Sequence, residues 1–230
     1  MANARERLTH LVELASQSAP EKSRALALEL CDLLLDWPED YSAAMRAPFE
    51  ALMEKVARGL DPATRKLVGA RLASSAKAPV DLLNGFFFDV PAELKETILA
   101  RNDLPTSASE PEMRDDDAEM TLLDAMRGEG NSDFAPLLGR CLAIETAAAE
   151  LVAGDARAFA IACRGAQFAR ATWSSVSLLR FGANPVSVEA DYAHLGLFDD
   201  IAPNAARRML QYWRSRRDAP IAAEADMQAA

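Results

Sequence analysis

Apolar residues recur along most of the chain at the three- and four-residue spacing of an α-helix. Residues 3–17 carry one such stripe, made of Leu8, Leu11, Val12 and Ala15. This spacing predicts an amphipathic outer helix. The following helix is predicted to run to about Asp36 and is apolar almost all round, so it must be covered on several sides. We find no Val/Ile/Thr-rich alternating run, and the chain is therefore predicted to be all-α.

Prolines mark the starts of the later helices in the N-terminal half. Asp61-Pro62 combines a side chain that can cap free amides with a proline at the first helical position, where no hydrogen bond is lost. Pro79 and Pro91 are likewise predicted to mark the starts of helices. Pro48 instead lies inside a helical pattern, and it predicts a kink or a division of that helix.

A polar stretch from Asn102 to Asp117 interrupts the apolar periodicity. It contains prolines, a Thr-Ser-Ala-Ser run and an acidic cluster, which bury too little apolar surface to offset the entropy of ordering. We interpret it as a linker between an N-terminal helical half, residues 1–101, and a C-terminal helical half, residues 118–217. Residues 218–230, rich in alanine and acid, are predicted to be a disordered tail.

Short helical patterns fill the C-terminal half. They cover residues 119–127, 134–142, 146–152, 156–167, 169–181, 188–198 and 203–217. Gly128 and Gly130 supply a stop after the first of them. Short helix pairs with marked turns are typical of a HEAT-like α-solenoid, but the periods are irregular, so an irregular bundle of antiparallel helix pairs stays open.

Charge and composition exclude several classes of function. The formal net charge of −10 repels nucleic-acid phosphates and anionic lipid surfaces, so nucleic-acid binding is disfavoured. The start of the chain has no apolar signal region and no stretch approaches a membrane span, so we expect a cytoplasmic protein. Cys31, Cys141 and Cys163 lie in apolar patterns and are expected to be reduced core residues.

The sequence contains no recognisable catalytic or metal-binding constellation. His10 and His194 are the only histidines, and neither has a zinc-type spacing beside it. No phosphate-binding glycine loop or nucleophile elbow occurs. Asp115-x-Asp117 resembles the start of a calcium loop but lacks its turn glycine, so it is interpreted as an acidic helix start. We therefore expect a non-enzyme without cofactor or metal.

The candidate functional residues are instead those of a protein-interaction surface. We select the aromatic run Phe86, Phe87 and Phe88 and the basic residues Arg214, Arg216 and Arg217, with core packing and helix-end charge as their structural alternatives. The leading hypothesis is a helical-repeat scaffold or adaptor that binds a protein partner. The alternatives are signalling phosphotransfer through His10 and nucleic-acid binding through the arginines; homodimerisation stays open.

Segments of the C-terminal half resemble a widespread family of alphaproteobacterial proteins of unknown function. Phe159–Ala166, followed by Arg170–Trp173, looks like the family's Leu-Ala-x-Ala-Cys-(Arg/Lys)-Ala segment. Ala206–Arg214 is similar to its closing helix, which carries a late Trp-Arg.

The N-terminal half extends the resemblance. Met45–Leu52 sits where family members carry a Val-Arg-x-x-Leu-Ala-like repeat, and Ala78–Val80 sits where they resume with Pro-Val. Pro48 and the Phe86–Phe88 run depart from the family's pattern. The resemblance implies a HEAT-like helical N-terminal half and a helical C-terminal half, and it carries over no catalytic residue.

Overall fold

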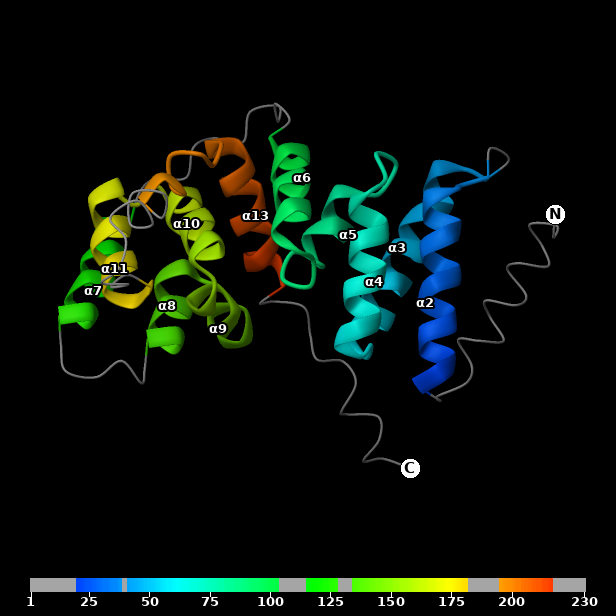
Figure 1. Cartoon of the computed structure of the whole chain (residues 1–230), viewed down its shortest axis with the longest axis horizontal. Helices are drawn as coiled ribbons and strands as arrows, with labels where there is room; N and C mark the ends of the chain where they lie inside the picture. Colours follow the sequence, from blue (N-terminus) through cyan, green and yellow to red (C-terminus); the bar gives the residue numbers. More distant parts are fainter. Residues whose placement is uncertain (1–19, 39–40, 104–114, 128–133, 182–194, 217–230) are drawn as a thin grey trace. The chain divides into compact units, whose positions relative to one another are not determined.

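The structure, a computed structural model, describes residues 20–38, 41–103, 115–127, 134–181 and 195–216. Within these ranges the chain forms eleven helices and no strand, which confirms the all-α prediction. The chain divides into two compact units, Met1–Arg101 (unit 1) and Asn102–Ala230 (unit 2) (Figure 1). Several predicted features lie outside the described residues: the helix over residues 3–17, most of the helix over 188–198, the Gly128–Gly130 stop and the tail.

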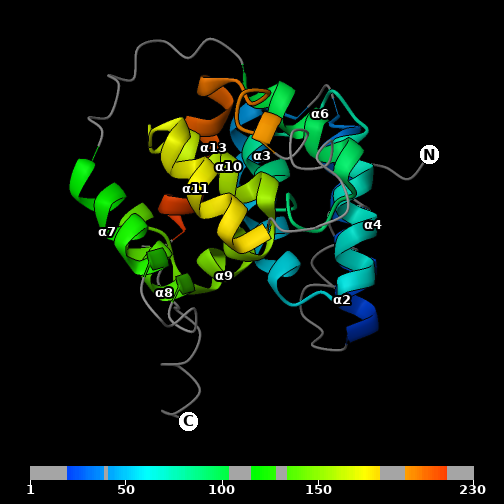
Figure 2. The same cartoon turned by 60° about the vertical axis from the view of Figure 1, so that its left-hand side comes forward.

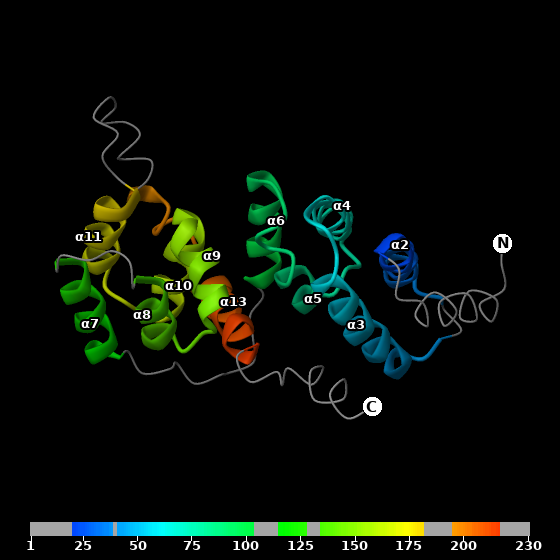
Figure 3. The ribbon, with the colours of Figure 1, turned by 90° about the horizontal axis from the view of Figure 1, so that it is seen from below.

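Unit 1 is built from α2 (Pro20–Leu35), α3 (Ala43–Arg58), α4 (Pro62–Ala73), α5 (Val80–Asn84) and α6 (Ala92–Asn102), the last residue of α6 being counted with unit 2. α2 packs against both α3 and α4, and Figure 3 looks nearly along α2 and α4 while α3 lies across the view. The core of unit 1 takes at least one large side chain from each helix: Leu30, Leu34, Met53, Leu72, Leu82, Leu83, Phe86, Phe87 and Ile98.

Local sequence explains where α4 begins and how α3 continues past a proline. Asp61 caps α4 as predicted, since its Oδ1 accepts a hydrogen bond from the Thr64 N–H at 3.0 Å. The hydrogen bonds from Thr64 lower the pKa of the Asp61 carboxyl. Pro48, however, does not divide a helix, because α3 runs through it. Pro48 is exposed and lies in the second turn of α3, so the helix continues there with one backbone hydrogen bond missing.

Arginines from other elements satisfy carbonyls at several helix ends. The last carbonyls of a helix have no partner inside it. In unit 1, Arg65 Nη1 donates to the Ala57 carbonyl in the last turn of α3 at 2.6 Å. Unit 2 uses the same device twice, at the ends of α9 and α8: Arg180 Nε donates to the Ala153 carbonyl at 2.7 Å, and Arg214 Nε to that of Leu142 at 2.8 Å.

Unit 2 contains α7 (Asp116–Arg127), α8 (Phe134–Leu142), α9 (Thr146–Gly154), α10 (Ala156–Gly165), α11 (Arg170–Phe181) and α13 (Pro203–Ser215). α10 is buried over most of its length and packs closely on α13, while α7 packs beside α11 (Figure 2). The core of the unit includes the buried side chains Leu122, Leu138, Phe159, Ile161, Trp173, Met209, Leu210 and Trp213.

Gly165 allows the close approach of α10 and α13, and this gives a first prediction. A Cβ on Gly165 would lie 2.6 Å from the Ala206 carbonyl oxygen and 3.0 Å from Leu210 Cβ. Gly165→Ala is therefore expected to lower the free energy of unfolding of unit 2 by about 1–3 kcal/mol, measured by urea denaturation.

The matched control is Gly154, at the end of α9, where an added Cβ meets no atom of the described residues within 4 Å. Gly154→Ala is expected to be neutral or to stabilise unit 2 slightly, because alanine favours the helix. Equal destabilisation by both substitutions would show that the α10–α13 contact is not the cause.

The two ends of the predicted linker belong to helices. Asn102 is the fully buried last residue of α6, and Asp116 and Asp117 open α7. Residues 104–114 lie outside the described residues. Among the described helices, none is both long and apolar enough to cross a membrane.

Candidate protein-interaction site

Most of the aromatic run chosen from the sequence is part of the core of unit 1. Phe86 and Phe87 are 1% and 0% exposed, and Phe88 is half-buried with its ring edge-on to Phe87 at 5.4 Å between centroids. Arg65 lies over the Phe86 ring at 5.4 Å and Lys95 over the Phe87 ring at 5.1 Å. The run therefore leaves only part of Phe88 for contact with a partner.

The described members of the basic group chosen from the sequence, Arg214 and Arg216, make different contacts within unit 2. Arg214 donates to the Leu142 carbonyl, as described above, and the Arg216 guanidinium lies 4.8 Å from the centroid of the Tyr212 ring. Arg217 lies outside the described residues. Neither described arginine is an isolated surface charge.

A different aromatic cluster, which the sequence reasoning missed, remains half-exposed in unit 1. The Trp37 ring lies edge-on to Tyr41 and to Phe49, at centroid distances of 5.5 and 5.6 Å. All three side chains are half-buried. We call these three residues the aromatic corner; it lies where α2 ends and α3 begins.

α3 continues this apolar surface along its own axis. Met45, Phe49, Leu52 and Val56 follow the i, i+4, i+7, i+11 spacing that places side chains on one side of a helix. Met45 is 40% exposed and the other three are half-buried. We call these four residues the α3 face. Met53 and Leu60 of the same segment are buried, and the spacing in the sequence does not separate them from the four residues of the α3 face.

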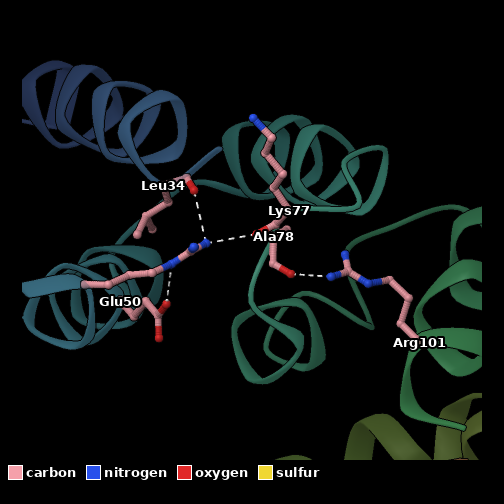
Figure 4. A network of polar contacts seen from close by, with 6 residues as sticks. Leu34, Glu50, Lys77, Ala78 and Arg101 are labelled. Atoms are coloured by element: carbon pink, nitrogen blue, oxygen red, sulfur yellow. Dashed lines mark hydrogen bonds and ion pairs between the residues drawn. The ribbon is translucent and has the colours of Figure 1, made fainter. Parts of the chain in front are cut away.

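Arg46 fixes the aromatic corner to its surroundings. Its Nε donates to Glu50 Oε1 at 2.9 Å, and its Nη2 donates to the carbonyls of Leu34 and Lys77 at 3.1 and 2.9 Å (Figure 4). Its guanidinium carbon lies 5.9 Å from the centroid of the Trp37 ring. One side chain thus connects the end of α2, α3 and the loop between α4 and α5 beneath the aromatic cluster.

Arg101 of α6 holds the same loop from the other side. Its Nη1 donates to the Ser75 carbonyl at 2.8 Å, and its Nη2 donates to the Ala76 carbonyl at 3.0 Å. The same Nη2 also donates to the Ala78 carbonyl (Figure 4). Burial lowers the pKa of the Arg101 guanidinium. Since Arg46 binds the Lys77 carbonyl, consecutive carbonyls of residues 75–78 all accept from arginines, and the loop under the aromatic corner is rigidly held.

The described residues offer little reactive chemistry. No group of three or more metal-ligating side chains occurs within them. His10 and His194, the candidates for phosphotransfer and metal binding, lie outside them. Burial raises the pKa of Cys31 to about 11 and raises that of Cys163 well above its ordinary value.

The cysteines give a second prediction. Only the thiolate is nucleophilic, and of the three cysteines only Cys141 is not fully buried. We expect iodoacetamide at pH 8 to alkylate Cys141 in the native protein, slowly because burial raises its pKa too, and to reach Cys31 and Cys163 only after unfolding. Mass spectrometry of peptides after timed labelling measures this order. Equally fast native labelling of Cys31 would contradict its burial.

No family model, curated protein or solved structure matches this chain. The resemblance to the alphaproteobacterial family therefore stays a prediction.

Proposed function

We propose that this protein is a non-catalytic helical scaffold or adaptor that binds another protein through the aromatic corner and the α3 face. The observation that carries the proposal is the α3 face, which is apolar and partly exposed. It lies beside the aromatic corner, where hydrogen bonds hold Arg46 and the backbone of the 75–78 loop in place. The packing of α2 on α3 and α4, with proline at the start of α4, supports a HEAT-like arrangement of helix pairs in unit 1.

The side chains of this surface are of the kinds that bind proteins. Trp, Tyr, Met and Arg are enriched at interfaces, and aromatic rings give a large contact area at a small entropic cost. Arg46 and Arg101 orient the surface before binding, which reduces the cost of ordering it. Removal of Met45 and Phe49 from water would favour the binding of a partner here.

The partner that fits is an amphipathic helix. The α3 face extends over twelve residues from Met45 to Val56, about 16 Å along the axis of a helix. A partner helix with apolar side chains at i, i+3 or i+4, i+7 and i+11 matches this length. The net charge of −10 argues against nucleic acid as the ligand.

The test compares two single substitutions in the full-length chain. Met45→Asp places a charge on the α3 face, while Leu67→Asp changes a residue of similar exposure, 46% against 40%, on α4. A protein captured from the native cytosol is purified, and its affinity for each variant is measured by titration calorimetry. We expect Met45→Asp to weaken binding at least tenfold, about 1.4 kcal/mol, and Leu67→Asp to leave it unchanged. Equal affinity of both variants would overturn the proposal.

A further inference from the structure

Along the first half of α3 the exposed side of the helix carries no charge. Between residues 44 and 51, the exposed side chains are Ala44, Met45, Ala47, Pro48 and Ala51. The two charged residues of this stretch, Arg46 and Glu50, are half-buried and form an ion pair with each other at 2.9 Å (Figure 4). A partner on the α3 face therefore meets an apolar surface over about two turns of helix.

Lys55 borders the α3 face in the last turn of the helix. It is exposed, and it lies beside Leu52, three residues earlier on the same side of α3. Within the described residues Lys55 forms no ion pair. The other charged residues of this turn, Glu54 and Arg58, lie on the side of α3 that is turned away from Val56, because each residue of a helix advances by about 100°. Lys55 is therefore the charge of α3 that a partner meets at this end.

An acidic side chain borders the same surface at the aromatic corner. Asp36 is exposed and directly precedes Trp37, whose ring contacts that of Phe49 on the α3 face. In the part of the chain that the structure describes, Asp36 forms no ion pair either. Lys55 lies six residues beyond Phe49, about 9 Å along the axis of α3. The apolar surface thus has a negative charge at the aromatic corner and a positive charge toward the end of α3.

The dipole of a helix relates these two charges to a direction. An acidic side chain near the N-terminus of a helix and a basic side chain near its C-terminus each stabilise that helix. A partner helix that runs antiparallel to α3 brings its N-terminus toward Lys55 and its C-terminus toward the aromatic corner. Its own favourable charges then lie opposite Lys55 and Asp36, whereas a parallel helix with the same charges would bring like charges together.

We propose that the partner of the α3 face is an amphipathic helix antiparallel to α3, with an acidic residue in its first turn beside Lys55 and a basic residue in its last turn beside Asp36. This inference rests on the proposed function and adds the direction and the charge pattern of the partner. Apolar contacts supply the affinity, and the two charges select the orientation.

Two synthetic peptides serve as probes of the charge pattern. Both carry leucines at i, i+4, i+7 and i+11; one has glutamates in its first turn and lysines in its last, and the other has these charges exchanged. Their affinities for the full chain are measured by fluorescence anisotropy at low salt. We expect the peptide with the acidic first turn to bind about threefold more tightly or better, as for one or two exposed ion pairs. High salt is expected to remove this preference, because it screens exposed charges.

Charge exchange on the protein separates recognition from differences in the helicity of the peptides. Asp36→Lys combined with Lys55→Glu is expected to reverse the preference between the two peptides. Lys66→Glu combined with Glu93→Lys changes two exposed charges on α4 and α6 and is expected to leave the preference unchanged. Urea denaturation of each variant shows whether unit 1 is folded.

The same preference in the wild type and in the variant with Asp36 and Lys55 exchanged would overturn the inference. If that variant does not fold, a wild-type preference that is absent, or that persists in high salt, overturns it. Met45→Asp identifies which proposal has failed. If Met45→Asp weakens the binding of both peptides while the charge exchange has no effect, the inference fails alone. If neither peptide binds, or if Met45→Asp leaves their binding unchanged, the proposed function fails and the inference fails with it.

Discussion

Replacing Phe87 with alanine is expected to lower the free energy of unfolding of unit 1 by about 3–5 kcal/mol. The ring is fully buried, packs edge-on against Phe88 and lies under the Lys95 ammonium. Its removal leaves a cavity that the surrounding helices fill only in part. Urea denaturation followed by the fluorescence of Trp37, the tryptophan of unit 1, measures the loss.

Phe88 is the matched control, because it is adjacent in sequence but only half-buried. Phe88→Ala is expected to cost clearly less than Phe87→Ala, since less apolar surface returns to water. Similar losses for the two would contradict the placement of Phe87 in the core. The result also matters for binding experiments, because alanine replacement of the whole run would remove a partner site by unfolding unit 1 and not by changing a surface.

Replacing Glu119 with alanine is expected to destabilise unit 2 by about 3 kcal/mol, the range for loss of hydrogen bonds to a buried charge. Glu119 lies on α7 and is 3% exposed. Its Oε1 accepts from the Ala169 N–H at 2.8 Å and from the Thr172 hydroxyl, so it caps the N-terminus of α11 from another helix. Its carboxylate also contributes, after burial, to the raised pKa of Cys163.

Two further variants separate capping from general effects of charge on α7. Glu119→Gln keeps an acceptor oxygen but removes the charge that favours a helix N-terminus, so an intermediate loss is expected. Asp117→Ala removes an exposed carboxylate from the same helix and is expected to change stability little. Denaturation followed by the fluorescence of Trp173 and Trp213 in unit 2 measures all three variants. A loss for Asp117→Ala as large as that for Glu119→Ala would show that capping is not the cause.

Most helices of the described chain were predictable because their signals are local. The spacing of apolar residues and the Asp61-Pro62 cap act within one or two turns, and α4 begins where they place it. At Pro48 the same local reasoning predicted a kink or a division of the helix, and the division is wrong, because α3 runs through the proline.

The candidate site was less predictable, for a physical reason. Periodicity shows that Met45 and Met53 are apolar positions of one helix, but it cannot tell which of them faces α2. Nothing in the sequence of the aromatic run at residues 86–88 shows whether its side chains are buried in the core or exposed at the surface. Exposure is decided by the elements that pack on each side, which are distant in sequence.

The sequence alone determined an all-α chain, the approximate bounds of its helices and the polar break near residue 102, because these depend on composition and on neighbours along the chain. Only the tertiary structure decided that Phe87 is buried while Met45 is exposed. It also decided that Arg46 and Arg101 bind the 75–78 loop and that Glu119 caps α11. Such contacts join side chains to backbone groups on other helices, and nothing in the local spacing of an arginine or a glutamate specifies which distant group it will reach.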